Sequence, residues 1–192
     1  FTGGGTEADN MAVLGRWRTA CGPERRGTVV CSAVEHKAAG AAAQCAAAEG
    51  AELVLLGVDE DGRVDLGALE EALRADPCVV AVMWANNEVG TIQPVSAIGE
   101  RCREAGAVFH TDAVQAFGKV RVRVDETACD LLAISGHKVA GPKGIGALYV
   151  REGVQILPLV YGGGQERDLR PGTENVAAAI GMAVAAELAA RE

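Results

Sequence analysis

The stretch Asp130-Leu131-Leu132-Ala133-Ile134-Ser135-Gly136-His137-Lys138 decides the fold, and the turn Gly141-Pro142-Lys143-Gly144 follows it closely. An apolar run bounded by Gly and Pro is typical of a buried strand that leaves the core. Lys138 would then lie just past a strand end, where ligand sites form in open parallel sheets. A lone lysine at such a place is most often a surface amine, and the alternative is a Schiff-base nucleophile. The rest of the chain has to distinguish the two.

Strands and helices alternate along the rest of the chain. Short apolar runs predict strands at residues 28–31, 52–56, 78–84, 107–110, 130–134 and 146–150, and Phe1-Thr2 resembles the end of another. Helical spacing and caps predict helices at residues 6–19, 35–49, 65–74, 95–105, 113–117 and 173–191, the last of them amphipathic. This alternation predicts one α/β domain over residues 1–192, in which helices flank a mostly parallel central sheet.

The composition limits the classes of function. Only 4% of the 192 residues are aromatic, so aliphatic side chains must build the core. The net charge of -8 argues against a nucleic acid or an anionic membrane surface as partner. No apolar stretch approaches the roughly 20 residues that a membrane span needs, and the sequence shows no signal peptide.

The cysteines point to a reducing compartment. Six of them are scattered along the chain without a CxxC pair or a Cys/His cluster: Cys21, Cys31, Cys45, Cys78, Cys102 and Cys129. This distribution argues against zinc and against a disulfide framework, so we predict a cytoplasmic protein without a metal site. We expect all six to be packing residues in or beside strands and helices.

A glycine-rich loop, Gly3-Gly4-Gly5-Thr6-Glu7, precedes the first predicted helix. Free backbone N–H groups and the positive end of the helix dipole make such a loop a ready anion site, to which Thr6 adds a hydroxyl. An ordinary helix N-cap is the alternative. The loop lacks the last glycine of G-x-G-x-x-G and the Gly-Lys-Ser/Thr of a P-loop, which argues against a dinucleotide or nucleotide site.

Four predicted strands end in polar clusters: Glu35-His36, Asn86-Asn87, His110-Thr111-Asp112 and Ser135-Gly136-His137-Lys138. The carboxyl ends of parallel strands share one edge of a sheet, so we expect the clusters to converge. All three histidines of the chain fall in them, which favours a functional site over separate structural roles.

The clusters contain a lysine, a carboxylate and an imidazole that can stack on a ring, and the glycine loop can hold a phosphate. These are the groups that pyridoxal 5′-phosphate (PLP) requires, because a lysine amine binds its aldehyde and an aspartate keeps its ring nitrogen protonated. Plainer roles stay open for single residues: Asp112 as a helix N-cap, His137 as a cap of its strand, and Arg167 and Arg170 in surface ion pairs.

Taken in order, these motifs resemble the large domain of the cysteine desulfurases, the NifS/IscS-like group of the class V aminotransferase fold. The resemblance implies the fold-type I architecture of PLP-dependent transferases, and it runs across the whole chain. The matching stretches are residues 1–10, 35–37, 86–90, 110–113, 135–138, 141–146, 162–167 and 170–175.

The resemblance implies a role for individual residues. Lys138 corresponds to the Schiff-base lysine and His36 to the imidazole that stacks on the cofactor ring, and these two are the expected catalytic residues. Asp112 corresponds to the partner of the pyridine nitrogen and Gln115 to a donor to the phenolate oxygen. Asn87 is similar to the asparagine near that oxygen and the substrate carboxylate.

The resemblance also implies a phosphate cradle made of Gly5, Thr6, Ser135 and His137. Thr173 corresponds to a residue that reaches the partner's phosphate across a dimer interface, so a homodimer is implied. One departure is Gly3, where many relatives have Ser, and this glycine adds backbone freedom without removing a named ligand.

The implied activity is the conversion of L-cysteine to L-alanine, with the sulfur passed as an enzyme persulfide to an acceptor such as an iron–sulfur scaffold protein. The chain opens at Phe1 directly on the glycine loop and is about half as long as family members, so we expect a piece of a longer protein. The family's N-terminal segment, small domain, substrate-binding arginine and persulfide cysteine would then lie outside it. We therefore expect weak PLP binding through Lys138 and no sulfur transfer by these residues alone.

Several alternatives share these motifs or compete with them. Selenocysteine lyases and desulfurases dedicated to DNA or tRNA modification use the same residues. A PLP aminotransferase of the same fold is disfavoured by the stretches at 86–90 and 170–173. A non-catalytic, truncated module for dimerisation or scaffold binding would have no need for Lys138 and Asp112 together.

Overall fold

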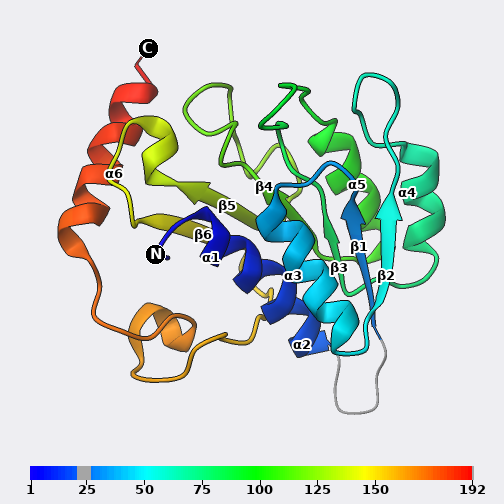
Figure 1. The fold of residues 1–192 in the computed structure, drawn as a ribbon, viewed down its shortest axis with the longest axis horizontal. Coiled ribbons are helices and arrows are strands. Elements are labelled where there is room, and N and C mark those ends of the chain that lie inside the picture. The colour runs from blue at the N-terminus through cyan, green and yellow to red at the C-terminus, as the bar shows by residue number, and fades with distance from the viewer. Residues whose placement is uncertain (21–26, 192) are drawn as a thin grey trace.

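The computed structural model describes residues 1–20 and 27–191. A six-stranded sheet with the order β2-β1-β3-β4-β5-β6 crosses the molecule, and helices lie on both of its faces (Figure 1). The first five strands pair in parallel, whereas β6, at one edge, is antiparallel to β5. The prediction of an α/β fold with a mostly parallel sheet is confirmed.

The six predicted strands are all present. They are β1 (Thr28–Ser32), β2 (Glu52–Leu56), β3 (Val79–Ala81), β4 (Phe109–Asp112), β5 (Leu131–Ser135) and β6 (Gly146–Val150). The α-helices are α1 (Gly5–Asn10), α2 (Arg16–Ala20), α3 (Lys37–Ala48), α4 (Leu66–Leu73), α5 (Val95–Ala105) and α6 (Val176–Ala189). A π-helical turn, η1 (Met11–Gly15), joins α1 to α2, and two 3-10 turns, η2 (Gly136–Val139) and η3 (Gln165–Asp168), lie in loops.

The central strands are buried on both faces of the sheet. Neighbouring residues of β1 contact different cores: Val30 packs with Leu69 of α4 and Ile98 of α5, whereas Val29 packs with Trp17 of α2. Side chains alternate between the faces of a strand, so a strand covered by helices on both sides must be apolar throughout. This is why these strands appear in the sequence as unbroken apolar runs.

The helix α3 approaches the sheet through small side chains. Ala42, Ala43 and Ala46 are at most 1% exposed and pack in the same core as β1. Alanine is the best helix former and leaves little volume between helix and sheet. The N-cap of α3 is His36, whose Nδ1 accepts the Ala38 N–H at 3.2 Å. The position of this histidine therefore depends on how closely α3 packs.

The first predicted helix is present but not regular. It runs from α1 through η1 to α2, and the carbonyl of Gly15 in η1 accepts two bonds, from the Leu157 N–H at 3.0 Å and from the Thr19 hydroxyl at 2.7 Å. A Cβ atom on Gly15 would lie 2.6 Å from the Leu157 oxygen. The segment around Leu157 thus passes directly against the π-helical turn, a tertiary contact that helical spacing does not reveal.

Three local predictions are wrong. Residues 113–117 form turns instead of a helix, with the N–H groups of Ala116 and Phe117 both donating to the Ala113 carbonyl. The apolar run 78–84 forms a strand only at β3, and its later residue Met83 donates its N–H to the Glu35 carboxylate. Thr2 makes an isolated bridge to Gly146 instead of ending a strand.

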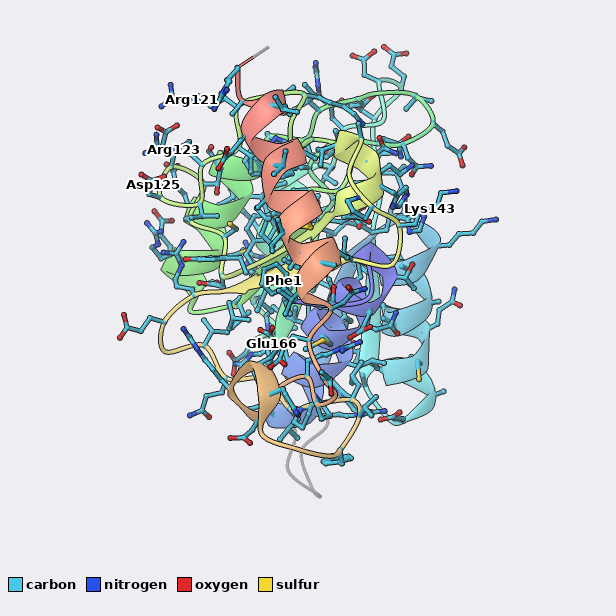
Figure 2. The ribbon with its side chains drawn as sticks, turned by 90° about the vertical axis from the view of Figure 1, so that its left-hand side faces the viewer. Phe1, Arg121, Arg123, Asp125, Lys143 and Glu166 are labelled. Atoms are coloured by element: carbon cyan, nitrogen blue, oxygen red, sulfur yellow. The ribbon has the colours of Figure 1, made fainter. Side chains whose placement is uncertain are left out.

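The helix α6 differs from the predicted amphipathic pattern. It lies beside the β6 edge of the sheet (Figure 1) and faces the viewer in Figure 2. Its exposed face is apolar, with exposures of 51% to 61% at Val176, Ile180, Val184 and Leu188. Among the helices that the structure describes, none has both the length and the apolar character to cross a bilayer.

Two helical glycines provide opposite tests of this packing. A Cβ atom on Gly99 of α5 would lie 2.0 Å from the Thr127 carbonyl oxygen, whereas one on Gly40 of α3 would meet no atom within 4 Å. We expect Gly99→Ala to lower the free energy of unfolding by about 1–3 kcal/mol through overpacking. Gly40→Ala should raise it by about 0.5–1 kcal/mol through helix propensity. Urea denaturation measures both free energies of unfolding. A change of the same sign in both variants would contradict the close contact described for Gly99.

Candidate functional site

A cavity of about 1050 Å³ lies where the polar clusters end their strands. Nine of the ten residues predicted from the sequence line it: Gly5, Thr6, His36, Asn87, Asp112, Gln115, Ser135, His137 and Lys138. Parallel pairing of β1, β3, β4 and β5 brings these residues together although they are far apart in the sequence. Thr173, the tenth, is exposed and is not among the residues that line the cavity.

The glycine loop forms one wall of the cavity. Gly4 has a φ of 151°, which favours glycine, and it precedes the first turn of α1, where backbone N–H groups have no acceptor within the helix. A Cβ atom on Gly5 would lie 2.7 Å from Cγ2 of Val114, so the loop can approach the β4 end only as glycine. Such an N-terminus suits a phosphate group.

On the other side of the loop, Ser135 and His137 face the same cavity. The Ser135 hydroxyl and Nδ1 of His137 are 2.8 Å apart, which fixes the imidazole at the start of η2. Gly136 lies between them, and a Cβ atom there would meet the side chain of Ile145 at 2.8 Å. The glycine loop, Ser135 and His137 thus combine backbone donors, a hydroxyl and an imidazole, as a phosphate cradle requires.

His36 lies at the end of the turn between β1 and α3, directly before the first residue of α3. Because its Nδ1 accepts the Ala38 N–H, the neutral ring carries its proton on Nε2. Glu35 anchors the turn: its carboxylate accepts the Ser32 hydroxyl at 2.7 Å and the Met83 N–H at 2.5 Å. Burial raises the pKa of Glu35 to about 7 despite these two bonds. The position of the His36 ring is therefore fixed by the Ala38 bond on one side and by the Glu35 bonds on the other.

Asp112 ends β4 and points into the cavity. Its Oδ1 accepts the Val114 N–H at 2.8 Å, but residues 113–117 form turns, so Asp112 closes a turn and is not the helix N-cap considered for it. Burial is the main cause that raises the pKa of Asp112 to about 7, and the Asp9 carboxylate adds to it. The Val114 N–H, His110 and Lys138 act in the opposite direction. A buried carboxylate of high proton affinity is a suitable partner for a protonated ring nitrogen.

Gln115 and Lys138 complete the arrangement. The Gln115 Oε1 accepts a bond from Nζ of Lys119 at 2.8 Å, which leaves its Nε2 as a donor toward the cavity. Lys138 lies on η2, half-buried, and near enough to Asp112 to lower the pKa of that carboxyl. The surface-amine interpretation of Lys138 does not fit this position inside the cavity wall.

Sequence reasoning assigned no individual role to Asp9, which lines the cavity, or to its buried partner His110. Asp9 and His110, both buried, form a pair in which Oδ1 and Nε2 are 3.1 Å apart. His110 lies within β4 and not at its exit, so its expected place among the cavity residues is wrong. A sequence signal was present, since a histidine within a predicted buried strand needs a hydrogen-bond partner.

A second missed contact joins the glycine loop to a distant segment. The Glu7 carboxylate accepts the Gly3 N–H at 2.9 Å and the Arg170 Nε at 2.9 Å. Partial burial opposes ionisation of Glu7, but the two bonds outweigh it and the pKa of Glu7 is lowered. The surface ion pair considered for Arg170 therefore exists, and it connects the loop to the segment that carries Thr173.

One donor atom from each of Asp9, His36 and Asp112 lies within 4.8 Å of the others. Two carboxylates and an imidazole also have the chemistry of a divalent-cation site. The same three residues line the cavity, so a cation and an organic cofactor would compete for them.

The described cysteines lie away from this cavity. Cys31, Cys78, Cys102 and Cys129 are buried packing residues, as expected, and burial raises the pKa of the Cys102 thiol to about 12. Cys45 is exposed, so the packing role expected for it is wrong. Cys21 lies outside the described residues. None of the cysteines within residues 27–191 lines the cavity.

The comparisons with known proteins agree with the geometry. The profile of the aminotransferase class-V family matches residues 1–192. The chain belongs to this family. It is 50% identical to a cysteine desulfurase of Bradyrhizobium diazoefficiens over 190 residues, which cover 99% of this chain and 48% of the relative. It is also 46% identical to a putative cysteine desulfurase IscS 1 of Bacillus subtilis, over 100% of this chain and 50% of the relative.

Two solved structures with 38% and 39% identity to this chain share its fold. A NifS-like protein superposes with a TM-score of 0.94 at 38% identity, over 100% of this chain and 52% of that protein. DndA from Streptomyces lividans superposes with a TM-score of 0.89 at 39% identity, over 100% of this chain and 55% of that protein. The chain thus spans about half the length of the relatives it matches. The expected resemblance to NifS/IscS-like cysteine desulfurases is confirmed.

The raised pKa of Asp112 predicts a pH-dependent stability difference. The folded state binds the Asp112 proton more tightly than the unfolded state does, because the pKa is higher in the folded state. As the pH rises from 3.8, the ordinary pKa of an aspartate, to about 7, this contribution to stability is progressively lost. Asp112→Asn removes this loss. In the cofactor-free chain, we expect the stability of the variant relative to the unsubstituted chain to rise by roughly 2–4 kcal/mol between pH 4 and pH 7 and then stay constant. Urea denaturation across this range measures the difference, and a flat difference would show that Asp112 is not perturbed.

Proposed function

We propose that the protein is a PLP-dependent cysteine desulfurase, which converts L-cysteine to L-alanine and passes the sulfur on as a persulfide. The observation that supports this best is the presence of Lys138, Asp112 and His36 in one cavity with a phosphate-type cradle. Relatives at 46% to 50% identity are named cysteine desulfurases, which supports the reaction class within the class V family.

The residues around the cavity fit PLP in size and chemistry. The backbone N–H groups of Gly5 and Thr6, the Ser135 hydroxyl and the His137 imidazole would hold the phosphate. Gln115 Nε2 would donate to the phenolate oxygen, and Asp112 would accept from the ring nitrogen. When bound, PLP supplies an electron sink for the bonds at the substrate α-carbon.

Three residues of the chain would act on the reacting groups. The Lys138 amine would attach the cofactor and, once displaced by the substrate amine, would carry a proton to or from the substrate carbon. His36 would cover the ring face and offer its Nε2 proton toward the sulfur. Asn87, which lines the same cavity, would orient the substrate carboxylate.

We also propose that the thiol which receives the sulfur is not among the described residues. The buried cysteines have thiols of low reactivity, since only a thiolate attacks and burial raises the pKa of Cys31 and Cys102. Cys45 is exposed but is not among the cavity residues. The described chain thus contains the groups for cofactor binding without the sulfur-accepting thiol.

The proposed partners follow from the same reaction. A persulfide has to be handed to an acceptor, and a scaffold protein for iron–sulfur clusters is the acceptor we propose. A homodimer is proposed because Thr173 is exposed and the Glu7–Arg170 pair ties its segment to the rim of the cavity. We propose the cytoplasm as its location, supported by the free thiols of Cys31, Cys102 and Cys129.

Two lysines line the cavity, Lys138 and Lys143, and they make a matched test. We expect borohydride treatment after PLP addition to leave a cofactor-sized mass increase on Lys138. Lys138→Ala should lose this increase, and Lys143→Ala should retain it, because only Lys138 lies beside Asp112. Intact mass and peptide mapping measure both. Labelling that survives in Lys138→Ala, or is absent from the unsubstituted chain, would contradict the proposed function.

The absence of a suitable thiol among the described cysteines predicts a limit on activity. The 192-residue chain loaded with PLP should release alanine and sulfide from L-cysteine no faster than PLP alone does, even with dithiothreitol present. Enzymatic assays of alanine and sulfide measure this. Turnover above the PLP background would show that one of the six cysteines accepts sulfur, and single Cys→Ser variants would identify it.

A further inference from the structure

Asp9 and His110 form the most deeply buried ion pair among the described residues that lie near the cavity. Their side chains are 1% and 0% exposed, and Oδ1 and Nε2 are 3.1 Å apart. A carboxylate buried to this extent needs a donor, and Nε2–H of His110 supplies it. The other ring nitrogen, Nδ1, has no hydrogen-bond partner within the described chain, so Asp9 is the group that fixes this ring.

The pair lies directly behind Asp112. His110 and Asp112 are two residues apart on β4, so their side chains share one face of the sheet. Asp9 comes to the same place from α1, and donor atoms of Asp9, Asp112 and His36 lie within 4.8 Å of one another. Asp112 is thus backed by a second carboxylate and by an imidazole.

The electrostatic effects of the two residues on Asp112 have opposite signs. The Asp9 carboxylate raises the pKa of Asp112, whereas His110 lowers it. Burial by itself would lower the pKa of His110, but the bond to Asp9 and the charges of Asp9, Asp112 and Glu35 together outweigh it and raise that pKa. The charged and titratable groups that face Asp112 come from α1, β4, η2 and the β1–α3 turn: Asp9, His110, Lys138, Glu35 and His36.

We propose that Asp9 and His110 are positioning residues that act through Asp112 to set how strongly the ring nitrogen of bound PLP keeps its proton. The negative charge of Asp9 favours the protonated nitrogen, and His110, which is paired with Asp9 and lowers the proton affinity of Asp112, limits this effect. The inference rests on the proposed function, since it concerns PLP in this cavity.

Substitution of each residue gives an opposite prediction. With PLP labelled with 15N in the ring bound to the full chain, the nitrogen chemical shift followed against pH gives the midpoint of its deprotonation. Asp9→Asn removes a nearby negative charge and should lower this midpoint by about one pH unit, a tenfold change. His110→Gln removes the group that opposes the effect of the Asp9 charge and should raise the midpoint.

Opposite shifts distinguish electrostatics from a structural role. If Asp9 and His110 merely hold β4 in place, both substitutions misplace Asp112 and both lower the midpoint, which would overturn the proposal. An unchanged midpoint in either variant would overturn it as well. If Asp9→Asn does not fold, the direction of the His110→Gln shift decides alone. Failure of the unsubstituted chain to bind labelled PLP would instead overturn the proposed function.

A remote carboxylate serves as the matched control. Asp125 pairs with Arg123 on the exposed surface, and Figure 2 places both on the opposite side of the view from Lys143, which lines the cavity. Asp125→Asn changes the net charge by the same amount as Asp9→Asn. We expect the pH midpoint for deprotonation of the ring nitrogen to stay within about 0.2 pH units of its value in the unsubstituted chain, because salt screens exposed charges over about 10 Å.

Discussion

The parallel pairing of β4 with β5 fixes the relative positions of the two groups on which the site depends. His110, Thr111 and Asp112 align with Leu131, Leu132 and Ala133, so both strands end at the same edge of the sheet. Asp112 is the last residue of one strand, and Lys138 lies in the 3-10 turn that directly follows the other. A shift of one residue in this register would turn Asp112 to the other face.

The polar groups at this edge are costly for an unliganded protein. Two buried carboxyl groups, Glu35 and Asp112, have pKa values near 7, and buried carboxylates close to one another repel. The fold offsets part of this cost with the Lys138 charge and with His110, both of which lower the pKa of Asp112. A ligand with a protonated ring nitrogen and an anionic phosphate would complement both the carboxylates and the glycine loop, so binding should stabilise the folded state by linkage.

The sequence predicted the sheet and most of the cavity because both follow from short-range patterns. Apolar runs marked the strands, and the polar residues after them marked the edge where His36, Asn87, Asp112 and Lys138 meet. The convergence could be predicted because it requires parallel topology alone and no knowledge of side-chain contacts.

Long-range contacts account for what the sequence did not reveal. The π-helical turn depends on Leu157, and the Asp9–His110 pair joins residues 101 positions apart in the chain. Residues 113–117 have helical spacing, yet Ala116 and Phe117 share one carbonyl acceptor in a turn. In each case a tertiary partner or a competing local bond overrides the propensity of the segment.

The alanine face of α3 has a consequence for how the site can change through evolution. Because Ala42, Ala43 and Ala46 are at most 1% exposed, one added methyl group would push the helix away from β1. His36 caps that helix, so the displacement would lift its imidazole from the cavity wall. Substitutions in the interior of α3 would thus change the position of the imidazole as well as the stability of the fold.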